Sequence, residues 1–166
     1  MLPENRQALM RYRLSMAKER LDSSKLLLEH ASYKDSIGRS YYAMFTAVRA
    51  ILALDGVDFK KHAGVISYFQ REYVKTKIFD VKYSKYLSQA FQIRNNTDYA
   101  DFFVVSEGEA EEQYEKYGII KRSCEEMNPH FFTAPFYFAF IWFRVQGSRF
   151  RVRGSGLWWR LRRHVR

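Results

Sequence analysis

The residue best placed for chemistry is an arginine that continues an apolar row. Tyr83, Leu87 and Ala90 stand three or four positions apart, and the next position of this row is Arg94. In a helix these side chains share one face, so the guanidinium is expected at a buried surface or an interface. A charge held out of water needs a partner, and Asp98 is the nearest one by spacing if the helix continues that far.

His62 is the histidine that could exchange a proton with a ligand at Arg94. It follows Lys60 and Lys61 at the predicted start of a helix, and only the tertiary fold could bring it to Arg94. A substitute general base is one interpretation, because imidazole titrates near neutral pH. The favoured interpretation is a histidine that caps its helix, or that supports the site from behind, by bonding a neighbouring helix.

Two adjacent phenols, Tyr41 and Tyr42, lie on and beside the apolar seam of another predicted helix. A phenol inside a helical bundle usually finds a hydrogen-bond partner for its hydroxyl, and Arg94 or Asp98 could supply one. We therefore expect the two tyrosines to support the site rather than to react.

The sequence gives no support for a metal or another cofactor. Cys124 is the single cysteine, and no pair of histidines, or of histidine and glutamate, stands at helical spacing where a cleft would form. No glycine-rich loop that could cradle a phosphate is present. One cysteine also excludes an internal disulfide framework and fits a reducing compartment.

Five amphipathic segments must position these residues. They are predicted at residues 7–32, 36–54, 62–76, 80 to about 97, and 106–126. Asp35 or Ser36 should cap the second segment and Gly56 should end it, whereas the poor helix propensity of residues 95–97 should end or loosen the fourth. Short connections between such helices predict an all-α, antiparallel bundle of four to five helices.

Three segments of the sequence are informative when their order and spacing are considered together. They are Ser40-Tyr41-Tyr42-Ala43-Met44-Phe45, then Lys60-Lys61-His62-Ala63-Gly64-Val65-Ile66, then Arg94 through Asp98 and Tyr99. Together they resemble the small prokaryotic HEPN-domain proteins over about residues 10–125. The resemblance implies a helical bundle that often forms a homodimer.

The resemblance also implies a partner and an activity. Many relatives are encoded beside a minimal nucleotidyltransferase as toxin–antitoxin pairs, so this chain is expected to be one component of such a system and to bind RNA or a nucleotide through the Arg94 face. In active relatives an arginine followed four to six residues later by histidine makes a metal-independent ribonuclease. Here those positions hold Asp98, Tyr99 and Ala100. A non-catalytic helical module that binds a nucleotide or a protein is the alternative.

The residue roles follow from this comparison. Arg94, with Asp98 and His62, is assigned to catalysis. Binding of RNA or nucleotide, or support of the motif, is assigned to Tyr41, Tyr42, Asn95 and Tyr99. In some relatives a tyrosine near the arginine is modified by the partner nucleotidyltransferase, a role that Tyr99 could take.

The net charge of +10 is unevenly spread along the chain. Residues 1–126 sum to +2, whereas residues 127–166 hold eight Arg and no acidic residue and sum to +8. We therefore divide the chain into a helical bundle, 1–126, and an aromatic, arginine-rich extension, 127–166, that is expected to be poorly ordered or irregular and not part of the domain.

A tandem seven-residue repeat at residues 143–156 favours a non-homologous origin for the extension. An interfacial membrane segment and a nucleic-acid-binding arm are the two alternatives. No apolar run reaches the roughly 18 residues that a spanning helix needs, and the N-terminus lacks an apolar signal segment. A cytoplasmic protein without a stable membrane span is expected.

Overall fold

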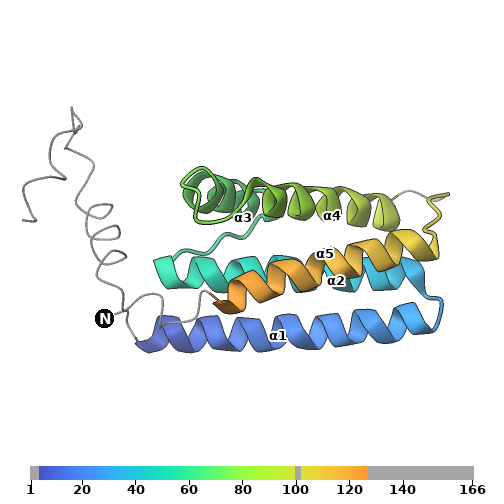
Figure 1. Cartoon of the computed structure of the whole chain (residues 1–166), viewed down its shortest axis with the longest axis horizontal. Helices are drawn as coiled ribbons and strands as arrows, with labels where there is room; N and C mark the ends of the chain where they lie inside the picture. The colour runs from blue at the N-terminus through green and yellow to red at the C-terminus, as the bar shows by residue number, and fades with distance from the viewer. Residues whose placement is uncertain (1–3, 100–101, 127–166) are drawn as a thin grey trace, which may run out of the picture. The chain divides into compact units, whose positions relative to one another are not determined.

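The structure, a computed structural model, describes residues 4–99 and 102–126. Its helices are α1 (Glu4–Glu29), α2 (Tyr33–Asp55), α3 (His62–Phe69), a π-helical turn η1 (Gln70–Val74), α4 (Val81–Tyr99) and α5 (Glu107–Glu126) (Figure 1). No strand occurs among the described residues. The prediction of an all-α bundle is confirmed, whereas residues 127–166, and the interpretations of that extension, lie outside the described part of the chain.

Helix α2 is the central element of the bundle. It packs against α1, α4 and α5, with α1 and α5 along much of its length (Figure 1). Helix α2 can pack on several sides because small and apolar residues, which are buried, occupy nearly every position between Ala43 and Leu54. The predicted seam of Tyr41, Met44, Phe45, Val48, Ile51 and Leu52 is buried throughout.

The start of α2 differs from the prediction that Asp35 or Ser36 caps it. The helix begins at Tyr33, after Ser32, so Ser36 lies one turn inside it. Ser36 is buried and exchanges hydrogen bonds with Ser24 of α1: the hydroxyl of each serine donates to the backbone carbonyl of the other at 2.9 Å. Two small side chains therefore let α1 and α2 approach closely at this point.

Three other helix ends carry local signals, and the end of α2 at Gly56 is as predicted. Gly56 ends α2 with a φ of 74°, the left-handed conformation that glycine adopts at low cost. Asp80 accepts a hydrogen bond from the backbone N–H of Lys82 at 2.8 Å as α4 begins. Before α5, the backbone N–H of Ser106 donates to Glu109 at 2.8 Å, and the Glu109 N–H donates back to the serine hydroxyl at 3.4 Å, which is a capping box.

The fourth helix does not end at residues 95–97, so that prediction was wrong. Helix α4 continues to Tyr99 because side chains compensate for the poor propensity of this stretch. Arg94 and Asp98 form an ion pair across one turn, and the hydroxyl of Thr97 donates to the carbonyl of Arg94 at 2.7 Å. The continued helix places Arg94 and Asp98 on one face.

The third helical segment is not uniformly α-helical. Helix α3 ends at Phe69 and passes into η1, within which Tyr73 is buried and donates to Asp55 at 2.8 Å. Within the described ranges, no helix combines the length and the apolarity that crossing a bilayer requires.

Candidate functional site

Arg94 lies on α4 with 16% of its side chain exposed. Its Nη2 lies 2.5 Å from Asp98 Oδ2, and its Nη1 donates to Asn95 Oδ1 at 3.2 Å. The Nε atom is buried and has no hydrogen-bond partner among the described residues. A buried donor without a partner costs free energy, so the Nε–H is the one hydrogen-bonding group of this guanidinium that the described residues leave unsatisfied.

Two tyrosine rings lie beside the guanidinium. The Cζ atom of Arg94 is 5.4 Å from the centroid of Tyr42, on α2, and 5.9 Å from that of Tyr99, on α4. Both distances are in the cation–π range. Tyr99 is 78% exposed, so its ring is free to stack on a flat group from solution.

His62, the first residue of α3, packs among aromatic side chains. Its Nδ1 lies 3.0 Å from the hydroxyl of Tyr41, and its ring centroid lies 4.4 Å from that of Phe45 and 5.8 Å from that of Phe91. Burial, together with the nearby charges of Arg94 and Arg49, lowers the pKa of His62 below its usual 6.5. The imidazole is therefore neutral at pH 7 and able to accept a proton.

Tyr41 is fully buried on α2. Burial, and to a smaller extent the neighbouring Tyr42, raises the pKa of Tyr41, against an opposing effect of Arg94. Its phenol stays protonated at any physiological pH and cannot act as a base. Its bond to His62 instead fixes the orientation of the imidazole.

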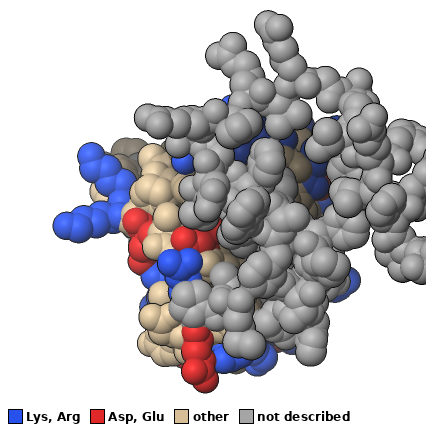
Figure 2. All heavy atoms as spheres, turned by 90° about the vertical axis from the view of Figure 1, so that its left-hand side faces the viewer, with Lys and Arg blue, Asp and Glu red and all other residues tan. Residues whose placement is uncertain are grey.

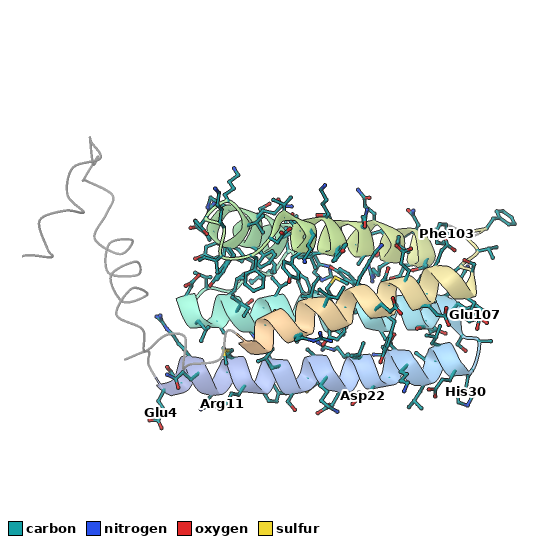
Figure 3. The ribbon with its side chains drawn as sticks, in the orientation of Figure 1. Glu4, Arg11, Asp22, His30, Phe103 and Glu107 are labelled. Atoms are coloured by element: carbon teal, nitrogen blue, oxygen red, sulfur yellow. The ribbon has the colours of Figure 1, made fainter. Side chains whose placement is uncertain are left out.

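The fold brings together all seven residues assigned from the sequence. Arg94, Asn95, Asp98 and Tyr99 come from α4, Tyr41 and Tyr42 from α2, and His62 from α3. Side chains fill the space between these helices (Figure 3). One detail was wrong: the hydroxyl of Tyr41 bonds His62 rather than Arg94 or Asp98, since the first turn of α3 packs over the middle of α2.

Two residues of the site were missed in the sequence. Phe45 and Phe91 enclose the ring of His62, and neither was given a role from the sequence, although Phe45 ends the motif that begins at Ser40. Phe91 precedes Arg94 by three residues, which could have placed it on the same face. No cluster of three or more His, Cys, Asp or Glu side chains that could hold a metal ion occurs in the described part of the chain.

The guanidinium of Arg94 can bind a phosphate, and the neutral imidazole of His62 can accept a proton from a ligand held there. The family model described as HEPN domain matches residues 10–127. The chain belongs to the HEPN-domain family. This HEPN match includes every residue of the site and all five α-helices, apart from the first turns of α1.

Several proteins are similar to this HEPN domain over part of their length. A UPF0332 protein of Thermotoga maritima is 39% identical over 85 residues, 51% of this chain and 64% of the relative. The UPF0332 protein PH1297 of Pyrococcus horikoshii is 42% identical over 77 residues, 46% of this chain and 54% of the relative. A Methanocaldococcus jannaschii protein named "Putative toxin MJ0142" is 33% identical over 98 residues, 59% of this chain and 67% of the relative. The matches thus span between about half and two thirds of these relatives.

Proposed function

We propose that this HEPN domain is one component of a two-gene, toxin–antitoxin-like system with a minimal nucleotidyltransferase, and that it binds RNA through the Arg94 face. The observation that carries the proposal is the buried, unpartnered Nε of Arg94 beside the rings of Tyr42 and Tyr99. A guanidinium binds a phosphate with paired N–H donors, and an exposed aromatic ring stacks on a base.

The relatives support the cellular setting. Two Methanocaldococcus jannaschii proteins that are 33% identical to this chain over part of their length carry the names "Putative toxin MJ0142" and "Putative toxin MJ0605". A shared fold does not determine the chemistry of a protein, so the binding proposal rests on the Arg94 site itself. A homodimer is part of the proposal, since HEPN relatives often dimerise.

Cleavage of the bound RNA is the enzymatic form of this proposal, and His62 is the residue that favours it. In the tautomer in which Nδ1 carries the hydrogen, Nδ1 donates to Tyr41 and Nε2 keeps its lone pair. Nε2 would take the proton of the 2′-hydroxyl, whose oxygen attacks the phosphorus while the 5′-oxygen leaves and takes a proton from water. Arg94 would stabilise the negative charge on the phosphate.

The binding test uses the full chain and a fluorescently labelled single-stranded RNA. Arg94→Ala should weaken binding at least about tenfold, because it removes a charge-assisted phosphate contact. Arg11→Ala is the matched control, since Arg11 is an exposed arginine of α1. Equal affinities of the two variants, with both folded by circular dichroism, would contradict the role of Arg94.

The cleavage test is run in the presence of a chelator. Wild-type protein should cut the RNA, His62→Gln and Arg94→Ala should not, and a 2′-deoxy substitution at the cut position should prevent cutting. RNA that stays intact after long incubation with wild-type protein would leave the non-catalytic binding module as the function.

Co-expression with the product of the neighbouring gene tests the partner: a nucleotidyltransferase should co-purify with the HEPN protein.

A further inference from the structure

A second group of arginines lies along α1, outside the site at Arg94. Arg6, Arg13 and Arg20 stand seven residues apart and so follow one line along the helix. Arg6 donates to a carbonyl near the end of α2 at 3.4 Å, Arg13 donates to the carbonyl of Arg49 at 2.9 Å, and Arg20 donates to the hydroxyl of Thr46. We call these three residues the arginine row; it faces α2.

One stripe of α2 joins the arginine row to the site. Tyr42, Thr46 and Arg49 are separated by four and three residues and therefore lie on one face of α2. The hydroxyl of Thr46 donates to the carbonyl of Tyr42 at 2.6 Å, and Arg94 lies over the ring of Tyr42. Arg20 and Arg94 thus approach the same stripe, one from α1 and the other from α4.

Positive charge exceeds negative charge along this stripe. Asp58 pairs with both Arg13 and Arg49, with N–O distances of 2.5 Å to each. Arg6 and Arg20, by contrast, form no ion pair within the described part of the chain and bond only uncharged oxygens. Two guanidinium charges of the arginine row are therefore available to an anion.

The surface is hollowed at one end of the arginine row. A cavity of about 350 Å³ opens beside Arg6, Arg13, Gly56 and Asp58. Figure 2 looks at this end of the bundle, and Lys and Arg side chains lie beside Asp and Glu side chains where its surface is visible. The shape and the charge of this end both suit an extended anion.

The length of the stripe defines the class of ligand. Tyr42 and Arg49 are seven residues apart, which is about 10 Å along an α-helix, and the arginine row spans about 21 Å. One phosphate cannot contact guanidinium groups at both ends of such a row. A ligand that reaches both Arg94 and the arginine row must carry several phosphates on one chain.

We propose that single-stranded RNA bound at Arg94 continues along the Tyr42–Thr46–Arg49 stripe to the arginine row, which forms a second phosphate-binding site. The ligand is then an oligonucleotide and not a mononucleotide. This inference rests on the proposed function, because it extends the ligand of the same site. Each phosphate contact in single-stranded RNA adds about 0.7 to the slope of log affinity against log salt, which is about fivefold in affinity at 0.1 M salt.

The experiment compares labelled RNAs of two and of twelve nucleotides on the full chain by fluorescence anisotropy. Arg20→Gln should weaken binding of the 12-mer about fivefold, lower its salt slope by about 0.7, and leave the dinucleotide unaffected. The matched control is Arg11→Gln: nine residues from Arg20, Arg11 points to the opposite side of α1, where Figure 3 also places Asp22. It should leave both affinities unchanged.

A further variant separates charge from structure. Thr46→Val removes the hydrogen-bond partner of Arg20 without removing a charge, so the affinity for the 12-mer should stay within about twofold of wild type. Equal affinities of Arg20→Gln and Arg11→Gln for the 12-mer would overturn the inference. If Arg94→Ala alone then lost affinity, the proposed function would still hold. The inference would also be overturned if Arg20→Gln weakened binding of the dinucleotide as much as binding of the 12-mer. Wild-type protein that binds neither RNA would overturn the proposed function and this inference together.

Discussion

At the scale of single residues, the site is defined by the carboxylate that stands one turn after Arg94. Asp98 pairs with the guanidinium at 2.5 Å and is 40% exposed, so a ligand phosphate must compete with it. An ion pair with this exposure is weak, so a phosphate can replace Asp98 as the partner of Arg94. Asp98 therefore acts on ligand affinity through the charge of Arg94.

Replacing Asp98 should strengthen RNA binding. In Asp98→Asn the Arg94 charge is no longer neutralised, and the affinity for single-stranded RNA should rise about threefold to fivefold at 0.1 M salt. Asp22→Asn, which removes a carboxylate from the ion pair with Lys18 on α1, is the control and should leave affinity unchanged. Weaker binding by Asp98→Asn would show that Asp98 itself contacts the ligand.

His62 should make the stability of the bundle depend on pH. Its pKa is lowered in the folded state by burial and by Arg94 and Arg49, so the unfolded chain takes up the proton first as the pH falls through about 6.5. The free energy of unfolding should therefore decrease from pH 7 towards pH 5 and level off below the folded-state pKa. Urea unfolding across this range should show a smaller decrease for His62→Gln than for wild type.

A control for this pH dependence is provided by His30, which is exposed at the turn after α1. His30→Gln should keep the wild-type decrease in unfolding free energy. If His62→Gln kept it as well, the imidazole of His62 would not be the group that titrates.

At the scale of helices, the loop from α2 to α3 determines where His62 and Asp58 lie. This loop begins at Gly56, whose φ is 74° and whose missing Cβ leaves space for the side chain of Arg6. A Cβ built there would come 2.5 Å from the Arg6 Cζ atom. The turn therefore depends on glycine for both its conformation and its contact with α1.

Two glycine substitutions should have opposite effects on stability. Gly56→Ala should lower the free energy of unfolding by about 1–2 kcal/mol, because the left-handed conformation is strained for alanine. Gly38→Ala, inside α2 with nothing within 4 Å of the new Cβ, should raise it by about 0.5–1 kcal/mol. Chemical denaturation measures both, and a neutral Gly56→Ala would show that the loop can adopt another turn.

Helices α2 and α5 are joined by a buried amide. Nε2 of Gln113 donates to the carbonyl of Ile37 at 2.8 Å and to the hydroxyl of Ser40 at 2.7 Å. Gln113→Ala should lower the free energy of unfolding by about 2 kcal/mol, because it leaves a cavity and removes the donor to the buried hydroxyl of Ser40. Glu112→Ala, one position along on an exposed side of α5, should cost less than about 0.5 kcal/mol in the same denaturation experiment.

At the scale of the whole molecule, we predict that the domain ends with α5. Ile120 and Cys124 are buried in the last turns of α5, and the family match ends at residue 127. Deleting residues 127–166 should therefore leave the urea unfolding midpoint unchanged. Ending the chain at residue 116 removes Tyr117, Ile120 and Cys124 from the core and should abolish cooperative unfolding. A lower midpoint after the first deletion would place part of the extension in the domain.

Much of the fold was predictable from local pattern. The apolar seam of α2 and the left-handed Gly56 follow from side-chain periodicity and backbone preference, which act over a few residues. The wrong predictions concern places where side chains override local preference. Residues 95–97 stay helical through the Arg94–Asp98 pair, and Ser36 lies inside α2 because it bonds Ser24.

The sequence by itself determined the helical bundle, from spacing within each helix, and the family, from three segments in order. The pairing of Arg94 with Asp98 was predicted only if the helix continued through residues 95–97, and the structure decided that it does. Only the tertiary structure decided that Tyr41 bonds His62 and that Arg94 lies over Tyr42, since these contacts join helices separated by long stretches of chain. The same is true of the arginine row. Its seven-residue spacing is visible in the sequence, but the stripe that joins it to Arg94 exists only because α1 and α4 pack on either side of α2.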